Sequence, residues 1–142
     1  MDRMNVIYDL RDDRWRIEQV QRASLSKKPV GLKITHGLVA TEEWWENIKQ
    51  DRLPTHVVEG NINQLWIGRT GDYPEVEIAD ANGFCSRWLL PIERSVAQRD
   101  LKIGRAIEIL YVQQELKKPF NGTGMTTFLL TVKVELPWAI LS

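Results

Sequence analysis

The feature that most constrains how this chain folds is a pair of strand-like runs on either side of Asn82 and Gly83. Asn-Gly is a strong hairpin signal because both residues tolerate positive φ. Before the turn, Val76 and Ile78 alternate with glutamates, and after it large apolar residues recur at alternate positions. Period-two alternation is typical of a strand with one buried face. The run therefore predicts an antiparallel β-hairpin.

The length of the connecting loop decides which faces of the two strands join. A three-residue loop that ends at Gly83 places Val76 opposite Trp88. The same loop places Glu77 opposite Arg87, so that one face is apolar and the other carries an ion pair. A two-residue loop would place Glu77 opposite Trp88 instead. Since a one-residue slip exchanges the two faces, we expect the three-residue loop, with Gly83 as a left-handed bulge residue.

Three further segments alternate in the same way: 57–67, 105–114 and 126–136. Gly60 lies inside the first of them, where a glycine usually marks a bulge or a bend. A polar crossover, 91–102, separates the hairpin from the last two strands. Three meandering strands, a crossover and two more strands resemble the oligonucleotide/oligosaccharide-binding (OB) fold. We therefore predict a mainly β fold, a five-stranded OB-like Greek-key barrel with an N-terminal helical addition.

Several short sequence segments show a second resemblance, to another group of proteins. GNINQLW (60–66), GDYPEVEI (71–78) and the Trp44-Trp45 segment are similar to small uncharacterised bacterial proteins of this barrel type. The run LKIGRAIEILYV (101–112) looks like the entry to a fourth barrel strand. No activity is known for those proteins, so the resemblance implies a fold and no reaction.

The rest of the chain divides by composition into segments around the barrel. The N-terminal part mixes Lys and Arg with Asp and Glu, with a short strand predicted at 5–10 and a helix at 14–22. A second helix is expected after Thr41, which can cap its N-terminus. We expect a charged N-terminal arm (1–29), a short strand plus a Trp-rich helix capping the barrel (30–54), the OB-like barrel (55–136) and an apolar C-terminal tail (137–142).

Composition restricts the location and the chemistry of the protein. The formal net charge is zero, so no strong field steers a charged ligand. Cys85 is the single cysteine, which excludes an intrachain disulfide. The first thirty residues contain no apolar signal-peptide core. We therefore expect a cytoplasmic protein that uses no cofactor and has no membrane partner.

The function predicted from these features is a non-catalytic binding or assembly module, with protein–protein contact or self-association into a homo-oligomer favoured. Six tryptophans and an apolar tail exceed what a small barrel needs to bury, and exposed apolar patches tend to mark contact sites. Two alternatives remain: the Trp-Trp helix plugs the barrel end, and the tail folds back over the barrel. The candidate interface residues are Trp15, Trp44, Trp45, Trp138, Ile140 and Leu141.

Single-stranded nucleic-acid binding is the alternative function, because OB folds bind ligands on the exposed strand face and its loops. Such a site needs cations and stacking rings. The candidate residues are Arg69, Tyr73, Arg87, Lys117, Lys118 and Phe120. Against this reading, the chain from Thr55 onward has nine Lys and Arg but ten Asp and Glu, so it lacks the positive excess that phosphate binding uses.

Enzymatic activity is not expected, and no catalytic or metal-binding residue is assigned. His36 and His56 have no metal-ligand partners at a recognised spacing. A remote alternative is a metal-dependent nuclease, in which Asp100 and Glu115 would hold the metal and Lys117 would assist a water. That motif lacks the structural context that such a site requires.

Overall fold

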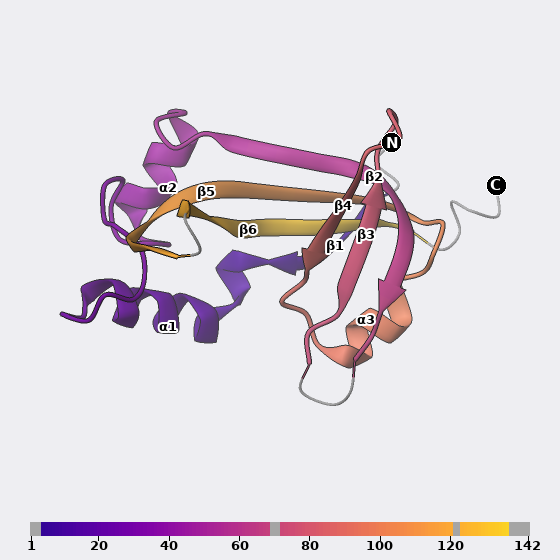
Figure 1. Ribbon diagram of the computed structural model, residues 1–142, viewed down its shortest axis with the longest axis horizontal. Helices are drawn as coiled ribbons and strands as arrows, with labels where there is room; N and C mark the ends of the chain where they lie inside the picture. The colour runs from indigo at the N-terminus through magenta and orange to yellow at the C-terminus, as the bar shows by residue number, and fades with distance from the viewer. Residues whose placement is uncertain (1–3, 69–71, 121–122, 137–142) are drawn as a thin grey trace. The chain divides into compact units, whose positions relative to one another are not determined.

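The computed structural model describes residues 4–68, 72–120 and 123–136, with the backbone alone at 119, 120 and 123 (Figure 1). Its elements in chain order are β1 (Met4–Asp9), the 3-10 helix η1 (Leu10–Asp12), α1 (Arg14–Leu25), α2 (Glu42–Lys49), β2 (Thr55–Trp66), β3 (Glu75–Ala79), β4 (Cys85–Leu89), α3 (Arg94–Asp100), β5 (Ala106–Phe120) and β6 (Thr123–Glu135). The chain forms two compact units. The first contains the described parts of 1–8, 57–109 and 131–142, and the second contains 9–56 and those of 110–130.

The strands form one antiparallel sheet in the order β1-β6-β5-β2-β3-β4, which confirms the mainly β prediction. The prediction of a five-stranded closed barrel is wrong, because the sheet has six strands and stays open. The physical reason is the short strand of the N-terminal arm. β1 pairs with the outer edge of β6, the edge that a five-stranded barrel would use to close against β4. The sheet therefore ends at β1 on one side and at β4 on the other.

The β3–β4 hairpin has the predicted register. Val76 lies opposite Trp88 and Glu77 lies opposite Arg87. Gly83 has φ of +83°, as expected for the left-handed bulge residue. The side chain of Asp80 stabilises the turn by accepting backbone N–H groups from the loop. Alternation and turn chemistry were therefore sufficient to predict this hairpin, and the Val76 side chain is fully buried as expected.

Gly60 is not the site of a bulge in the β2–β3 ladder. The irregularity in the β2–β3 ladder lies between Ile62 and Gln64, where the extra residue is Asn63. A Cβ atom at Gly60 would overlap the backbone carbonyl oxygen of Ala79. Glycine is therefore required at this position because the backbone after β3 passes too close for a side chain.

We expect Gly60→Ala to destabilise the fold by about 1–3 kcal/mol, because backbone atoms must move to make room for the new methyl group. Urea unfolding followed by tryptophan fluorescence measures the change. Gly124→Ala is the matched control, since a Cβ there meets no atom of the described residues within 4 Å and its φ is not positive. Equal unfolding midpoints for the two variants would contradict the steric explanation.

In the second unit, a capped helix supplies the core. Thr41 accepts the backbone N–H of Trp44, which confirms the predicted start of α2. Trp44 is 0% exposed and donates its indole N–H to the buried Gln114 Oε1 at 2.7 Å. Its ring meets Trp45 and Phe128 edge to face, with centroids 4.7 and 6.2 Å away. Trp44 is therefore the centre of this unit's core.

Candidate functional site

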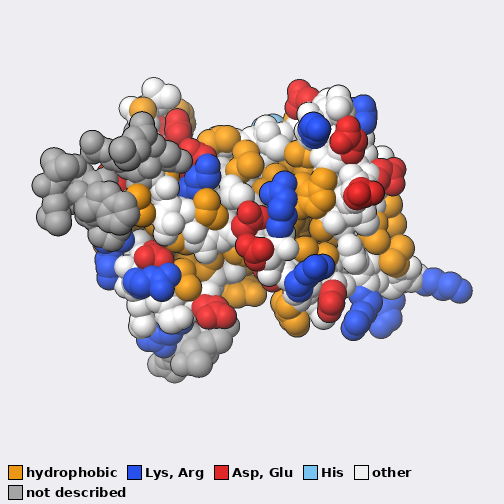
Figure 2. Space-filling model, turned by 180° about the vertical axis from the view of Figure 1, so that it is seen from behind, with side chains coloured by type: hydrophobic (Ala, Val, Ile, Leu, Met, Phe, Trp, Pro, Cys, Tyr) orange, Lys and Arg blue, Asp and Glu red, His pale blue; other side chains and the backbone are white. Residues whose placement is uncertain are grey.

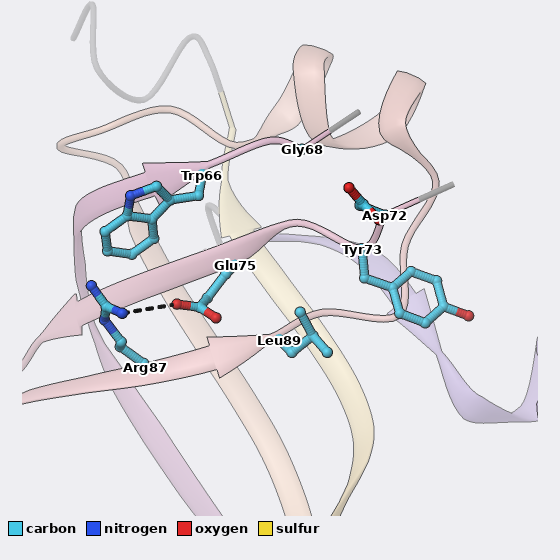
Figure 3. A pocket seen from close by; sticks show the side chains of 7 residues that line it. All are labelled: Trp66, Gly68, Asp72, Tyr73, Glu75, Arg87 and Leu89. Atoms are coloured by element: carbon cyan, nitrogen blue, oxygen red, sulfur yellow. Dashed lines mark ion pairs between the residues drawn. The ribbon is translucent and has the colours of Figure 1, made fainter. Parts of the chain in front are cut away.

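The first unit carries a shallow pocket of about 330 Å³ on the exposed side of β2, β3 and β4 (Figure 3). We call it the Trp66 pocket. It is lined by Trp66, Gly68, Asp72, Tyr73, Glu75, Arg87 and Leu89. Strand pairing creates its floor, because Glu75 lies opposite Trp66 on one side and opposite Leu89 on the other. Three adjacent strands thus present an aromatic, an acidic and an aliphatic side chain in one row.

Arg87 organises one end of the pocket. Its guanidinium carbon lies 4.2 Å from the centroid of the Trp66 ring, and its Nη1 lies 3.4 Å from Glu75 Oε1. Figure 3 shows the guanidinium beside the indole and joined to the Glu75 carboxylate by the ion pair, with Tyr73 and Asp72 at the other end of the pocket. The ion pair joins diagonal neighbours rather than the directly opposite pair that the sequence suggested. Glu77 instead accepts a hydrogen bond from Asn63 at 2.7 Å.

Large apolar groups remain accessible at this site. Trp66 is 39% exposed and Leu89 is 58% exposed, and Tyr73 is exposed as well. Tryptophan, tyrosine and arginine are the residue types that dominate binding energy at protein interfaces. The stacked cation also holds the indole in one orientation, so less side-chain freedom is lost when a partner binds. The arrangement is suited to contact with a macromolecule.

Sequence reasoning missed Trp66 and Leu89, and the reason for Trp66 is visible in β2. Trp66 has the same parity as Ile62, which is buried, so strict alternation places both on the core side. The bulge at Asn63 inverts the alternation, and Leu65 then lies opposite the buried Val76 while Trp66 lies opposite Glu75. The signal that could have revealed this is the pair Asn63 and Gln64, two consecutive polar residues between Ile62 and Leu65.

The candidate nucleic-acid residues are only partly brought together. Tyr73 and Arg87 line the Trp66 pocket, whereas Arg69 and the side chain of Phe120 lie outside the described residues. Lys118 is exposed in the second unit. Lys117 has a structural role, because its ammonium group donates to the carbonyl oxygens of residues 23, 26 and 28 at 2.8, 2.8 and 3.3 Å. It thereby stabilises the carboxyl end of α1, where a cation is favourable.

Among the described residues of the Trp66 pocket, the charges do not form a phosphate-binding surface. In the Trp66 pocket, Arg87 is the one cation beside Asp72 and Glu75 among the described lining residues. On the face that Figure 2 shows, blue and red side chains alternate with apolar ones, and neither sign forms a continuous patch. A nucleic-acid groove requires a basic track along the backbone. Nucleic-acid binding therefore stays a prediction without geometric support.

The candidate interface residues have different environments. Trp15 is 66% exposed on α1, and Trp45 is half-buried with the Arg11 guanidinium carbon 4.1 Å from its ring centroid. Trp44 is buried in the core, so it cannot touch a partner directly. The remaining candidates, Trp138, Ile140 and Leu141, lie outside the described residues.

The residues of the nuclease alternative are engaged in other contacts. Glu115 forms an ion pair with Lys33 at 3.0 Å, and Asp100 forms one with Arg99 at 2.9 Å. Lys117 is bound by backbone carbonyls. Among the residues that the structure describes, no group of three or more His, Cys, Asp and Glu side chains could hold a metal ion.

A comparison with protein families assigns the chain to one of them. The model of the family described as "Immunity protein RhsI2" matches residues 4–136, which covers both units. The chain therefore belongs to the RhsI2 immunity protein family. A search of the curated proteins finds no match. Within the described residues, every helix is too short or too polar to cross a membrane.

Proposed function

We propose that this chain is an antidote that neutralises a toxin by binding to it as a protein partner, without catalysis. Membership of an immunity protein family over residues 4–136 is the observation that carries the proposal. We further propose that the Trp66 pocket is the centre of the contact surface. Its exposed Trp66, Tyr73 and Leu89 and the preordered Arg87 are what a protein interface uses for affinity.

The charge balance supports a protein partner over a nucleic acid. The pocket contains carboxylates from Asp72 and Glu75 beside one cation, Arg87, and these would repel a phosphate backbone. The same carboxylates fit a basic protein surface, because complementary charge raises the association rate and excludes wrong partners. The neutralised toxin is therefore expected to present Lys or Arg to this face.

Growth protection tests the proposal. The probe is to be sought among the toxin-like domains encoded beside the chain's own gene and is called the neighbouring toxin below, since a cell that makes a toxin needs the antidote at the same time. Bacteria that express the toxin alone should stop growing, and bacteria that also express the chain should grow normally. A toxin from an unrelated pair is the control, and the chain should give no protection against it.

The binding step is measured separately with purified proteins. Titration calorimetry should give a one-to-one complex of the chain with the neighbouring toxin, with a dissociation constant in the nanomolar range or below. Absence of both growth protection and a complex would refute the proposed function. Protection without a complex would refute binding as its mechanism.

A further inference from the structure

The outer edge of β4 presents unpaired backbone groups in a regular pattern. Leu90 donates its N–H to the Pro74 carbonyl and Asp80 donates its N–H to the Phe84 carbonyl, so the even-numbered residues of β4 are hydrogen-bonded to β3. In an antiparallel ladder the intervening residues direct their N–H and C=O groups away from the partner strand. The backbone groups of Cys85, Arg87 and Leu89 therefore face outward, where no described strand pairs with them.

This edge has few of the features that usually prevent strand addition. Proteins protect edge strands with proline, lysine or a β-bulge. β4 reads CSRWL and contains neither proline nor lysine, and its ladder with β3 has no irregularity. Its one charged side chain, Arg87, reaches across the sheet face to Glu75 and Trp66 rather than guarding the edge. β4 is the outermost strand beside β3 (Figure 1).

The outward-facing edge is continuous with the Trp66 pocket. The side chains of Cys85, Arg87 and Leu89 lie on the exposed face, and the last two line the pocket. The apolar Leu89, which is 58% exposed, lies on this face at the end of the strand. A strand added here would place alternate side chains beside these groups, because directly opposite residues share a face.

The charges of this face indicate the chemistry of the added strand. Asp72, Glu75 and Glu77 supply three carboxylates in and beside the Trp66 pocket, and Arg87 is the one cation among the described residues that line it. Asp72 forms no ion pair with a described residue. An added strand with a Lys or Arg side chain on this face would balance the excess of negative charge. Apolar side chains of that strand on the same face would contact Leu89.

We propose that β4 accepts an extended, basic segment of the toxin as a seventh strand, so that the sheet continues from this chain into its partner. The inference deepens the proposed function and rests on it. Backbone hydrogen bonds from Cys85, Arg87 and Leu89 supply the pairing, and the Trp66 pocket supplies selectivity for the side chains, as in other cases of strand addition.

Amide hydrogen exchange distinguishes strand addition from docking on the sheet face alone. In the free chain, the amides of Cys85, Arg87 and Leu89 should exchange fast, while those of Ser86 and Trp88 are protected by β3. In the complex with the neighbouring toxin, the three outward amides should slow by about tenfold or more, as paired amides do. Amides of β1, the other edge strand, should keep their rates.

A proline variant tests the same edge by affinity. Cys85→Pro removes one outward N–H and leaves the ladder to β3 intact, since edge strands tolerate proline where the N–H faces outward. It should weaken toxin binding by about tenfold, whereas Cys85→Ala, which keeps the N–H, should bind like the natural chain. Should Cys85→Pro fail to fold, the exchange experiment on the natural chain decides alone.

The outcomes separate the two proposals. A complex in which the amides of 85, 87 and 89 stay as fast as in the free chain refutes strand addition and leaves the proposed function standing. Uniform slowing of all β4 amides, without the alternation, also refutes it and indicates docking on the face. Absence of any complex refutes both proposals.

Discussion

Trp66→Ala is expected to weaken binding of the neighbouring toxin by about 2–4 kcal/mol, which corresponds to a factor of roughly 30 to 1,000 in the dissociation constant. Trp66 is 39% exposed, so its ring offers a large apolar area that a partner can cover. Arg87 holds this ring at 4.2 Å and is itself tied to Glu75. Truncation therefore removes both the ring and the support that orders the guanidinium. Titration calorimetry measures the change.

Trp15→Ala is the matched control for this prediction. Trp15 is 66% exposed on α1 in the second unit and lies outside the Trp66 pocket. Its removal should change toxin binding by less than about 0.5 kcal/mol, as for a surface residue away from an interface. The reverse result, with binding lost in Trp15→Ala and kept in Trp66→Ala, would show that the interface lies on the second unit. Thermal unfolding should show both variants folded.

Trp44→Ala is expected to lower the free energy of unfolding by about 3–5 kcal/mol, the usual loss for a fully buried aromatic residue. Trp44 is 0% exposed, and its loss leaves a cavity beside Trp45 and Phe128. It also leaves the buried Gln114 Oε1 without its donor. A loss of this size is a large part of the stability of a small domain. Urea unfolding measures it.

Milder variants separate the contribution of the hydrogen bond to stability from that of the aromatic ring. Trp44→Phe keeps an aromatic ring but removes the indole N–H, so Gln114 loses its partner at a cost of about 1–3 kcal/mol. Combining it with Gln114→Leu should recover part of that loss, because both ends of the bond are then apolar. Trp44→Ala with less than about 1 kcal/mol of destabilisation would show that Trp44 is not the centre of this core.

Part of the candidate site could be predicted from the sequence. Arg87 was expected on the exposed face, because the register of the hairpin follows from the Asn82-Gly83 turn and from alternation. Tyr73 was expected in the ligand-binding loop that precedes the hairpin. Trp66 could not be predicted, because one extra residue at Asn63 inverts the side-chain alternation of β2. A bulge changes the faces of a strand without changing its composition. Lys117 could not be assigned either, because its three carbonyl partners are far away in the chain.

Local sequence patterns were enough to predict the hairpin register, the capped start of α2 and the alternation of β6. These depend on turn chemistry and on neighbouring residues, which act over short separations. The open sheet, by contrast, is a result of long-range pairing, since the six-residue strand β1 takes the edge of β6. Which strand pairs with a given edge depends on contacts between distant segments. Because β1 pairs with β6, β4 stays an edge strand, with the Trp66 pocket beside it.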